Sequence, residues 1–160
     1  MHILNICGNV KYLGRGNFSI FDQQSSQFVQ KQVKKIGMIT MGTGIAPMYQ
    51  IMQAIHWDPL DFTSASLLAY YDSPFETLLE DDLMKLEQDG IINYFPVIKN
   101  PDDMWVYGEG EICKNHIEHF MPYSDDEDSL ILICGGNQLA KSATEILQQE
   151  GFSKERYHIL

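Results

Sequence analysis

The strongest sign of a functional site in the sequence is a pair of glycines at the point where an apolar run passes directly into a segment of helical periodicity. Gly42, Thr43 and Gly44 follow the run 37–41, and apolar residues then recur at helical spacing, at Ile45, Met48, Met52 and Ile55. A strand, a glycine turn and a helix in this order bring unpaired backbone N–H groups and the positive end of a helix dipole to one point, which favours a bound anion such as a nucleotide phosphate. The glycines allow a tight turn and close approach of a ligand, and Pro47 suits the first helical turn. The alternative is a tight strand-to-helix connection of the kind that any α/β protein contains.

A second glycine turn follows the apolar run 130–134. Cys134, Gly135 and Gly136 end this run, and a second helical segment begins at residue 137. In a parallel sheet, ligands bind at the carboxyl ends of the strands, where four segments are expected to meet, namely 41–47, 70–73, 99–110 and 134–138. Two glycine turns at one crevice are a more specific signal than either alone. Cys134 could be a nucleophile, but no base lies beside it in the sequence, and a small residue at a strand end is the alternative.

Other catalytic and metal-binding patterns are weak or absent. His116 and His119 are three residues apart on one expected helix, and only Glu118 accompanies them. An exposed helical face explains this spacing, so no metal site is predicted. The sequence contains neither Gly-x-Ser-x-Gly nor Gly-x-x-x-x-Gly-Lys-Ser/Thr, which argues against a serine hydrolase and a P-loop NTPase.

Composition bounds the class of protein and its partners. The 160 residues suit one domain with a sizeable core, and the formal net charge of −11 would repel a nucleic acid rather than attract it. No apolar run is long enough to span a membrane and no signal peptide is evident, so membrane association is expected only through partners. Three widely spaced cysteines without Cys-x-x-Cys pairing favour an intracellular compartment, either mitochondrial or cytoplasmic.

The elements that must position these residues alternate from residue 36 onward. Strands are expected at 36–41, 65–71, 91–98, 129–134 and 156–160, and helices at 45–56, 76–88, 111–120 and 137–150. This alternation predicts an α/β fold with a doubly wound parallel sheet over residues 35–160. Before it, residues 1–34 are expected to form a short β-hairpin, with strands at 3–7 and 17–21, and then a polar linker or surface excursion over 22–34.

Taken in order, these motifs resemble those of the NADH–cytochrome b5 reductase family. Eukaryotic nitrate reductases share the same module. The resemblance rests on Gly42-Thr43-Gly44-Ile45-Ala46-Pro47-Met48, Ser66-Leu67-Leu68-Ala69-Tyr70, Trp105…Tyr107-Gly108…Gly110 and Leu132-Ile133-Cys134-Gly135. Upstream, Gly14-Arg15-Gly16-Asn17-Phe18 resembles the last hairpin of the family's flavin-binding barrel, which makes residues 1–34 a remnant of that barrel plus a linker. The resemblance implies a ferredoxin reductase-like fold with an NAD(P)-binding, Rossmann-like domain over 35–160.

The resemblance also implies a site for NADH. Around the pyrophosphate and nicotinamide it places Gly42, Thr43, Gly44, Ile45 and Pro47, and beside the nicotinamide it places the catalytic residue Cys134 with Gly135 and Gly136. Near the adenosine ribose it places Tyr70, Tyr71, Asp72 and Glu76. Acidic residues there would repel a 2′-phosphate, so NADH is expected to be preferred to NADPH. FAD would come from another chain or from a missing region.

Departures from the family pattern leave two functions open. The family's Cys-Gly-Pro-Pro-Pro-Met is Cys-Gly-Gly-Asn-Gln-Leu over residues 134–139, Met41 replaces the first glycine of Gly-Gly-Thr-Gly, and the flavin barrel with its Arg-x-Tyr-Ser/Thr motif is missing. The chain is expected to be either a reductase module that passes hydride from NADH to a flavin held elsewhere or a degenerate accessory subunit of a larger complex. In both cases a protein partner is expected to cover the side where the barrel would lie.

Overall fold

The centre of the molecule is a parallel sheet whose strands run in the order β10-β9-β5-β6-β7-β8. A computed structural model describes residues 4–160 of the chain. The strands are β5 (Lys35–Met41), β6 (Ser64–Tyr71), β7 (Ile92–Ile98), β8 (Gly108–Glu109), β9 (Ser129–Cys134) and β10 (Tyr157–Ile159), and every neighbouring pair is parallel. The predicted parallel α/β sheet is confirmed. The two-residue strand β8 was not expected from the sequence.

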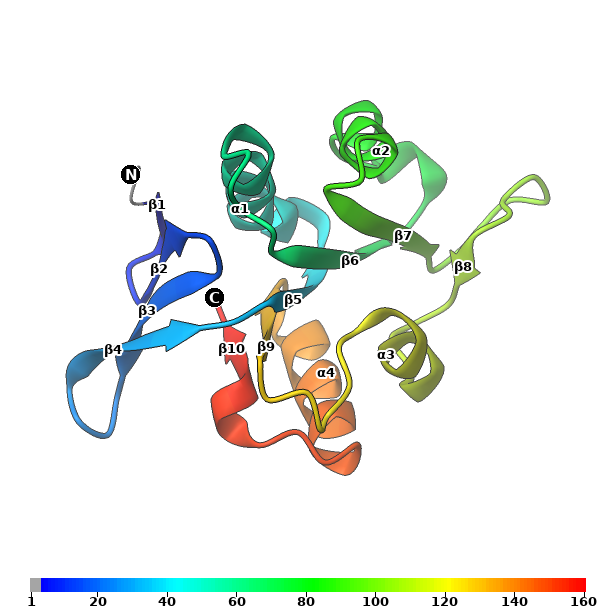
Figure 1. The fold of residues 1–160 in the computed structure, drawn as a ribbon. Coiled ribbons are helices and arrows are strands. Elements are labelled where there is room, and N and C mark those ends of the chain that lie inside the picture. Colours follow the sequence, from blue (N-terminus) through cyan, green and yellow to red (C-terminus); the bar gives the residue numbers. More distant parts are fainter. Residues whose placement is uncertain (1–3) are drawn as a thin grey trace.

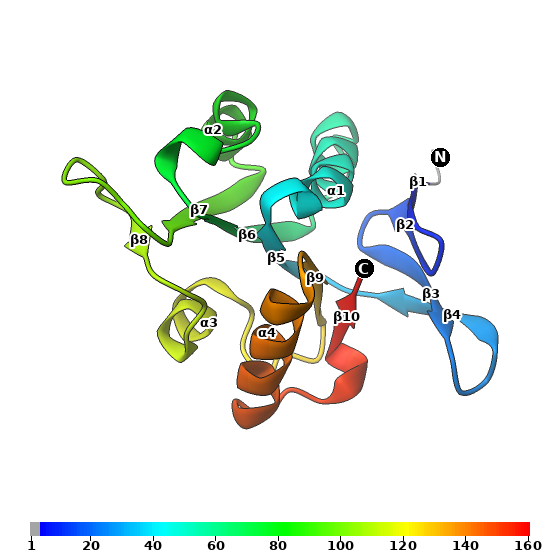
Figure 2. The ribbon, with the colours of Figure 1, turned by 180° about the vertical axis from the view of Figure 1, so that it is seen from behind.

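Helices cover both faces of this sheet (Figures 1 and 2). The helices are α1 (Ile45–Trp57), α2 (Glu80–Gln88), α3 (Lys114–Phe120) and α4 (Asn137–Gln149), with α1 and α2 on one face and α3 and α4 on the other. The doubly wound arrangement is thereby confirmed. Among the described residues, no helix combines the length and the apolar character needed to cross a membrane.

Two helices begin later than the sequence indicates, and local backbone conformation explains both differences. Before α2, Pro74–Glu76 form a separate 3-10 turn, Thr77 is extended, and Leu79 has a φ of 58° in the left-handed region. A left-handed residue cannot continue a right-handed helix, so α2 begins at Glu80 and not at residue 76. Before α3, Cys113 is extended, and the helix begins at residue 114 and not at 111.

The N-terminal region is an antiparallel sheet of four strands, in the order β1-β2-β3-β4. Its strands are β1 (Leu4–Cys7), β2 (Val10–Gly14), β3 (Asn17–Asp22) and β4 (Gln27–Gln32). The expected single hairpin was incomplete, because β2 lies between its two strands. The expected linker over 22–34 was wrong, because β4 pairs with β3 along its whole length. The strand β4 is polar and largely exposed, so it lacks the apolar pattern that marks a buried strand. Residue 3 of the expected first strand lies outside the described residues.

Alternate residues of the central strands pack into two separate core layers. In β5, Ile36 and Met38 join a cluster with α1, α2 and the N-terminal sheet, whereas Ile39 joins a cluster with α3 and α4. Strand β9 is buried on both faces, as its continuous apolar run predicts. Since Tyr12 and Phe18 of the N-terminal sheet belong to the first cluster, that sheet shares its core with the parallel sheet.

A buried carboxylate joins the two sheets. Asp61, in the loop between α1 and β6, accepts hydrogen bonds at Oδ2 from the Tyr12 hydroxyl at 2.6 Å and the Arg15 backbone N–H at 2.7 Å. Its Oδ1 accepts bonds from the backbone N–H of Thr63 at 3.1 Å and from the Thr63 hydroxyl at 2.5 Å. Beside this cluster, Gly16 has a φ of 74°, and a Cβ there would lie 1.9 Å from the carbonyl oxygen of Val33. The contact between the sheets therefore depends on Asp61 and Gly16.

Candidate functional site

The two glycine turns predicted from the sequence meet at the carboxyl edge of the parallel sheet. Strands β5 and β9 are neighbours, with Thr40 opposite Cys134, so the turn after β5 lies against the turn after β9. Gly44 is buried, and a Cβ on it would lie 2.1 Å from the carbonyl oxygen of Cys134. A Cβ on Gly135 would lie 2.7 Å from Leu139 Cδ2 and 3.1 Å from Met41 Cβ. Gly44 and Gly135 therefore allow the two turns to interlock.

The other two glycines of these turns have open space where a side chain would stand. No atom lies within 4 Å of an added Cβ at Gly42 or Gly136, and Gly42 has a φ of 55° that favours glycine. The helices α1 and α4 that follow have no side-chain cap hydrogen bond at their N-termini. The first-turn N–H groups of two helices and their dipoles thus converge on one edge, where an anion is favoured.

The remaining predicted residues of the first turn have different surroundings. Thr43 is exposed, Pro47 is half-buried in the first turn of α1, and the Ile45 side chain is buried in the core beneath α1. Ile45 can therefore take part in a ligand site only through its backbone. The prediction of a helix beginning at Ile45 is confirmed.

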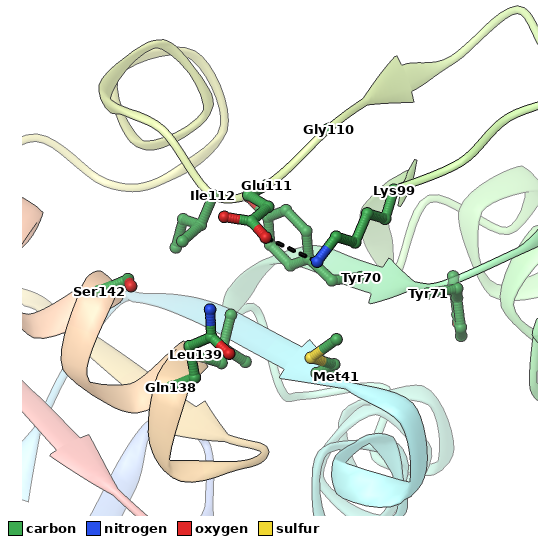
Figure 3. Close-up of a pocket in the computed structure, with 10 residues that line it drawn as sticks. All are labelled: Met41, Tyr70, Tyr71, Lys99, Gly110, Glu111, Ile112, Gln138, Leu139 and Ser142. Carbon is green, nitrogen blue, oxygen red and sulfur yellow. Dashed lines mark ion pairs between the residues drawn. The ribbon is translucent and has the colours of Figure 1, made fainter.

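A pocket lies beside this edge, on the side of α3 and α4 (Figure 3). Its cavity volume is about 70 Å³, and its walls come from the ends of β5 and β6, the segments after β7 and β8, and the first two turns of α4. The lining residues are Met41, Tyr70, Tyr71, Lys99, Gly110, Glu111, Ile112, Gln138, Leu139 and Ser142. Pockets that enclose a small molecule typically measure roughly 300–1,000 Å³. This pocket can therefore enclose one part of a dinucleotide, and the rest must lie along the edge.

One ion pair crosses the pocket. The Lys99 Nζ lies 2.7 Å from Glu111 Oε1, and both side chains point into the space between β6 and α4 (Figure 3). The hydrogen bond and the attraction between the two charges raise the pKa of Lys99 and lower the pKa of Glu111, and the charge of Asp72 adds to the rise at Lys99. Both groups are therefore charged at neutral pH. They are the charged side chains among the residues that line the pocket.

The buried tyrosine of the pocket, Tyr70, forms a hydrogen bond with His116 of α3. The Tyr70 hydroxyl lies 2.9 Å from His116 Nδ1, and Phe95 packs against the same imidazole ring. Burial raises the pKa of Tyr70 and lowers the pKa of His116. When the neutral imidazole carries its proton on Nε2, Nδ1 accepts a hydrogen bond from the phenol hydroxyl, which keeps its own proton. The hydroxyl of Tyr70 is thereby directed toward α3, and its ring forms part of the pocket wall.

The two histidines that were considered as metal ligands have different hydrogen-bond partners in the structure. His116 contacts Tyr70, whereas His119 Nδ1 lies 2.8 Å from the backbone oxygen of Asn115. Over residues 4–160, no group of three or more His, Cys, Asp and Glu side chains is arranged to hold a metal ion.

The acidic residues predicted near the ribose lie outside the pocket wall. Asp72 and Glu76 are exposed and are not among the lining residues. The negative charge of Asp72 nevertheless contributes to the raised pKa of Lys99. The backbone carbonyl of Asp72 accepts a hydrogen bond from the backbone N–H of Asn100 at 3.2 Å. Glu76 belongs to the 3-10 turn before α2. Of the residues predicted for the ribose, only Tyr70 and Tyr71 line the pocket.

Cys134 lies on the other face of the sheet from Tyr70. It is half-buried and packs against the core cluster of α1, whereas Tyr70 belongs to the cluster of α3 and α4. It does not line the pocket. The predicted role of Cys134 beside a nicotinamide therefore requires a ligand that extends across the sheet edge from the pocket to the α1 side.

Sequence reasoning did not single out the charged residues of the pocket. Lys99 lies inside a segment expected at the strand ends, because it directly follows β7. Glu111 lies just outside the segment 99–110 expected at the strand ends and was expected to be the first residue of a helix over 111–120. It is brought to Lys99 by the pairing of β8 with β7, in which Glu109 is opposite Ile98 and Gly110 donates a hydrogen bond to Ile98. A two-residue strand carries no sequence pattern, so nothing in the sequence could have revealed this position.

A parallel α/β sheet with two glycine turns before helix N-termini at one edge is typical of a nucleotide-binding α/β domain. The chain matches the sequence profile of the family described as "Oxidoreductase NAD-binding domain" over residues 38–145. It therefore belongs to this family, and its relatives place it with the cytochrome b5 reductases and nitrate reductases.

Two relatives and one solved structure illustrate this placement. The chain is 35% identical over 153 residues to NADH-cytochrome b5 reductase 3 of Mus musculus, covering 93% of this chain and 50% of that protein. It is 31% identical over 140 residues to the NADH nitrate reductase of Spinacia oleracea, covering 86% of this chain and 14% of that protein. The cytochrome b5 reductase domain of Ulva prolifera nitrate reductase superimposes with a TM-score of 0.85 at 25% identity, covering 96% of this chain and 58% of that one. The chain spans about half the length of the cytochrome b5 reductases it matches.

Proposed function

We propose that the chain is the NADH-binding module of a cytochrome b5 reductase-like oxidoreductase, and that it presents the nicotinamide to a flavin held elsewhere. The observation that carries the proposal is the convergence of two helix N-termini without side-chain caps and two glycines with open space, Gly42 and Gly136, beside a pocket. This edge provides backbone N–H groups for a pyrophosphate without requiring a basic side chain.

The residues of the edge fit such a ligand, and each has a distinct task. The backbone from Gly42 to Ile45 would hold the pyrophosphate, with about 0.3–1 kcal/mol of stabilisation from the helix dipole. The pocket would hold one end of the dinucleotide between Tyr70 and α4, and Cys134 would lie beside the nicotinamide at the other end. When bound, NADH supplies a hydride, and the FAD that accepts it would come from another chain or another region. The chain's own contribution is to bind and orient the nicotinamide.

Calorimetry on the chain tests the proposal directly. We expect NADH to bind more tightly than NADPH, because the acidic side chains near the pocket disfavour a 2′-phosphate. Binding is expected to be weak, since Met41 narrows the pocket and Gly136-Asn137-Gln138 replace the family's rigid prolines. Cys134→Ala should leave the affinity for NADH largely intact while slowing reduction of a flavin partner. Failure of both dinucleotides to bind would contradict the proposal.

The alternative, an accessory subunit of a larger complex, is favoured by the free edge of the N-terminal sheet. Within residues 4–160, strand β4 pairs with β3 alone; it is largely exposed and contains no proline and no acidic residue. Its single charged side chain, Lys31, donates a hydrogen bond from Nζ to the backbone oxygen of Glu155 at 2.7 Å. Proteins commonly protect such an edge with charges, prolines or bulges, and the pairing of β3 with β4 has no bulge. We propose that a partner protein adds a strand to β4.

Hydrogen exchange on β4 tests this partner proposal. In the intact native complex, the amides of residues 27–32 should exchange more slowly than in the chain purified alone, because an added strand supplies hydrogen-bond acceptors for them. The amides of β9 are the internal control, since that strand lies between β10 and β5 and is paired in both states. Equal exchange of β4 in both preparations would contradict the added strand.

A further inference from the structure

We infer that an exposed apolar surface around α2 docks a partner protein that presents lysine and arginine side chains around an apolar centre. This surface, which we call the α2 surface, consists of residues 72–89 and 100–111. It lies at the opposite end of the parallel sheet from the N-terminal sheet and its edge strand β4 (Figures 1 and 2). The inference does not depend on the proposed function, and it concerns an interface separate from the edge of β4.

Large apolar side chains are exposed on both segments of the α2 surface. Phe75 is 93% exposed, and Met104 and Val106 are 87% and 83% exposed. Among the described residues, these are three of the four most exposed large apolar side chains. Leu78 and Leu79, just before α2, are exposed as well. Exposed apolar side chains that gather on one surface, with polar residues around them, mark a site of protein interaction.

The fold holds the two segments of this surface in place. The backbone N–H of Asn100 donates a hydrogen bond to the backbone oxygen of Asp72 at 3.2 Å, so the two segments leave the sheet side by side. Between the exposed Met104 and Val106, the side chain of Trp105 packs against the core cluster of α1 and α2. Its Nε1 also donates a hydrogen bond to a backbone oxygen of the same loop at 2.8 Å. The two neighbours of Trp105 are therefore exposed on an anchored loop.

The charge around these apolar side chains identifies the chemistry of the partner. Residues 72–111 contain eleven acidic and two basic side chains, a formal charge of −9, whereas the rest of the chain contains eleven acidic and nine basic side chains. All eleven acidic residues of 72–111 are exposed. Within residues 4–160, Glu111 is the only one of them in an ion pair, whereas five of the other eleven are paired with lysine or arginine. Most of the negative charge is therefore available to a cationic partner.

The same charge argues against two other kinds of occupant. Nucleic acids and membranes of anionic lipids are negatively charged, so the α2 surface repels both. Protein interfaces, in contrast, combine an apolar centre with a polar rim, and complementary charges steer the two proteins together. A basic protein surface with apolar side chains at its centre matches both the exposed apolar residues and the carboxylates around them.

Zero-length carbodiimide cross-linking of the chain in its native assembly tests the inference, because this reagent joins a carboxylate to an amine that contacts it. Mass spectrometry should find cross-links from the carboxylates of residues 72–89 and 102–111 to lysines of one partner protein. Absence of these cross-links, or cross-links from acidic residues elsewhere in the chain alone, would overturn the inference. Cross-links between two copies of this chain would also overturn it, because the occupant would then be a second copy.

Surface plasmon resonance with the cross-linked protein, purified by itself, then separates the apolar and the charged contributions. Met104→Ser should weaken binding about tenfold, as expected for loss of an apolar contact at the centre of an interface. The double variant Asp103→Asn with Glu109→Gln should slow association severalfold at low salt, because it removes two steering charges. All three side chains are exposed, so these variants should keep the melting temperature of the parent chain.

The matched control is the double variant Asp125→Asn with Glu127→Gln, which removes two charges from exposed side chains outside the α2 surface. It should bind the partner like the parent chain. Equal slowing of association by the two double variants would overturn the inference, because the partner would then respond only to the net charge of the chain. Binding of the parent chain to phosphatidylcholine vesicles that is lost in Met104→Ser would also overturn it, since a neutral lipid surface would then be the occupant.

Discussion

Replacing Asp61 by alanine should lower the free energy of unfolding by about 2–5 kcal/mol, because it leaves several buried donors without an acceptor. The donors are the hydroxyl of Tyr12, the backbone N–H of Arg15, and both the backbone N–H and the hydroxyl of Thr63. Burial and the hydrogen bond to Asp61 raise the pKa of Tyr12, so this hydroxyl remains a donor throughout the accessible pH range. Urea unfolding followed by circular dichroism measures the change.

A neighbouring aspartate provides the matched control. Asp58 lies in the same loop and pairs with Arg15 Nε at 2.9 Å, but both side chains are partly exposed. An exposed pair contributes about 0–1 kcal/mol, so Asp58→Ala should have a small effect. Hydrogen exchange should further show that Asp61→Ala loosens β2 and β3 before the parallel sheet. Equal destabilisation by the two alanine variants would show that Asp61 does not hold the sheets together.

Replacing Gly44 by alanine should destabilise the protein by about 1–3 kcal/mol or more and weaken dinucleotide binding, because both effects depend on the interlocked turns. The added methyl would lie 2.1 Å from the carbonyl oxygen of Cys134 and 2.6 Å from its carbonyl carbon. These are backbone atoms of a strand end, so they cannot move aside as a flexible side chain would. The expected result is therefore a displacement of the turn after β9 together with the start of α4.

Gly136→Ala is the control for this substitution. Gly136 has a φ of −66°, which alanine adopts without strain, and no atom lies within 4 Å of an added Cβ. Its stability should stay within about 0.5 kcal/mol of the parent chain. Chemical unfolding and calorimetry with NADH on both variants give the comparison. A Gly44→Ala protein as stable as Gly136→Ala would mean that the two turns do not interlock as described.

Local patterns in the sequence were sufficient to predict the parallel sheet and its helices. The run over β9 predicted a strand buried on both faces, and the residues after Gly44 predicted α1 from its first residue. Such predictions succeed because a strand covered on both faces must be apolar throughout, and a helix that covers a sheet must repeat its apolar residues every three or four positions. The same reasoning predicted the edge at which the glycine turns meet, since parallel strands all end on one side.

The tertiary structure alone decided which residues line the site and how the N-terminal region folds. Strand β4 carries no apolar alternation, because it lies at an exposed edge and is specified by its backbone pairing with β3. Lys99 and Glu111 are twelve positions apart and meet only through the two-residue pairing of β8 with β7. The two glycines of the turn after β5 likewise have different surroundings, Gly42 facing open space and Gly44 facing the backbone of another strand. Sequence patterns report the burial that each segment requires, whereas contacts between distant segments follow from packing, which no local pattern encodes.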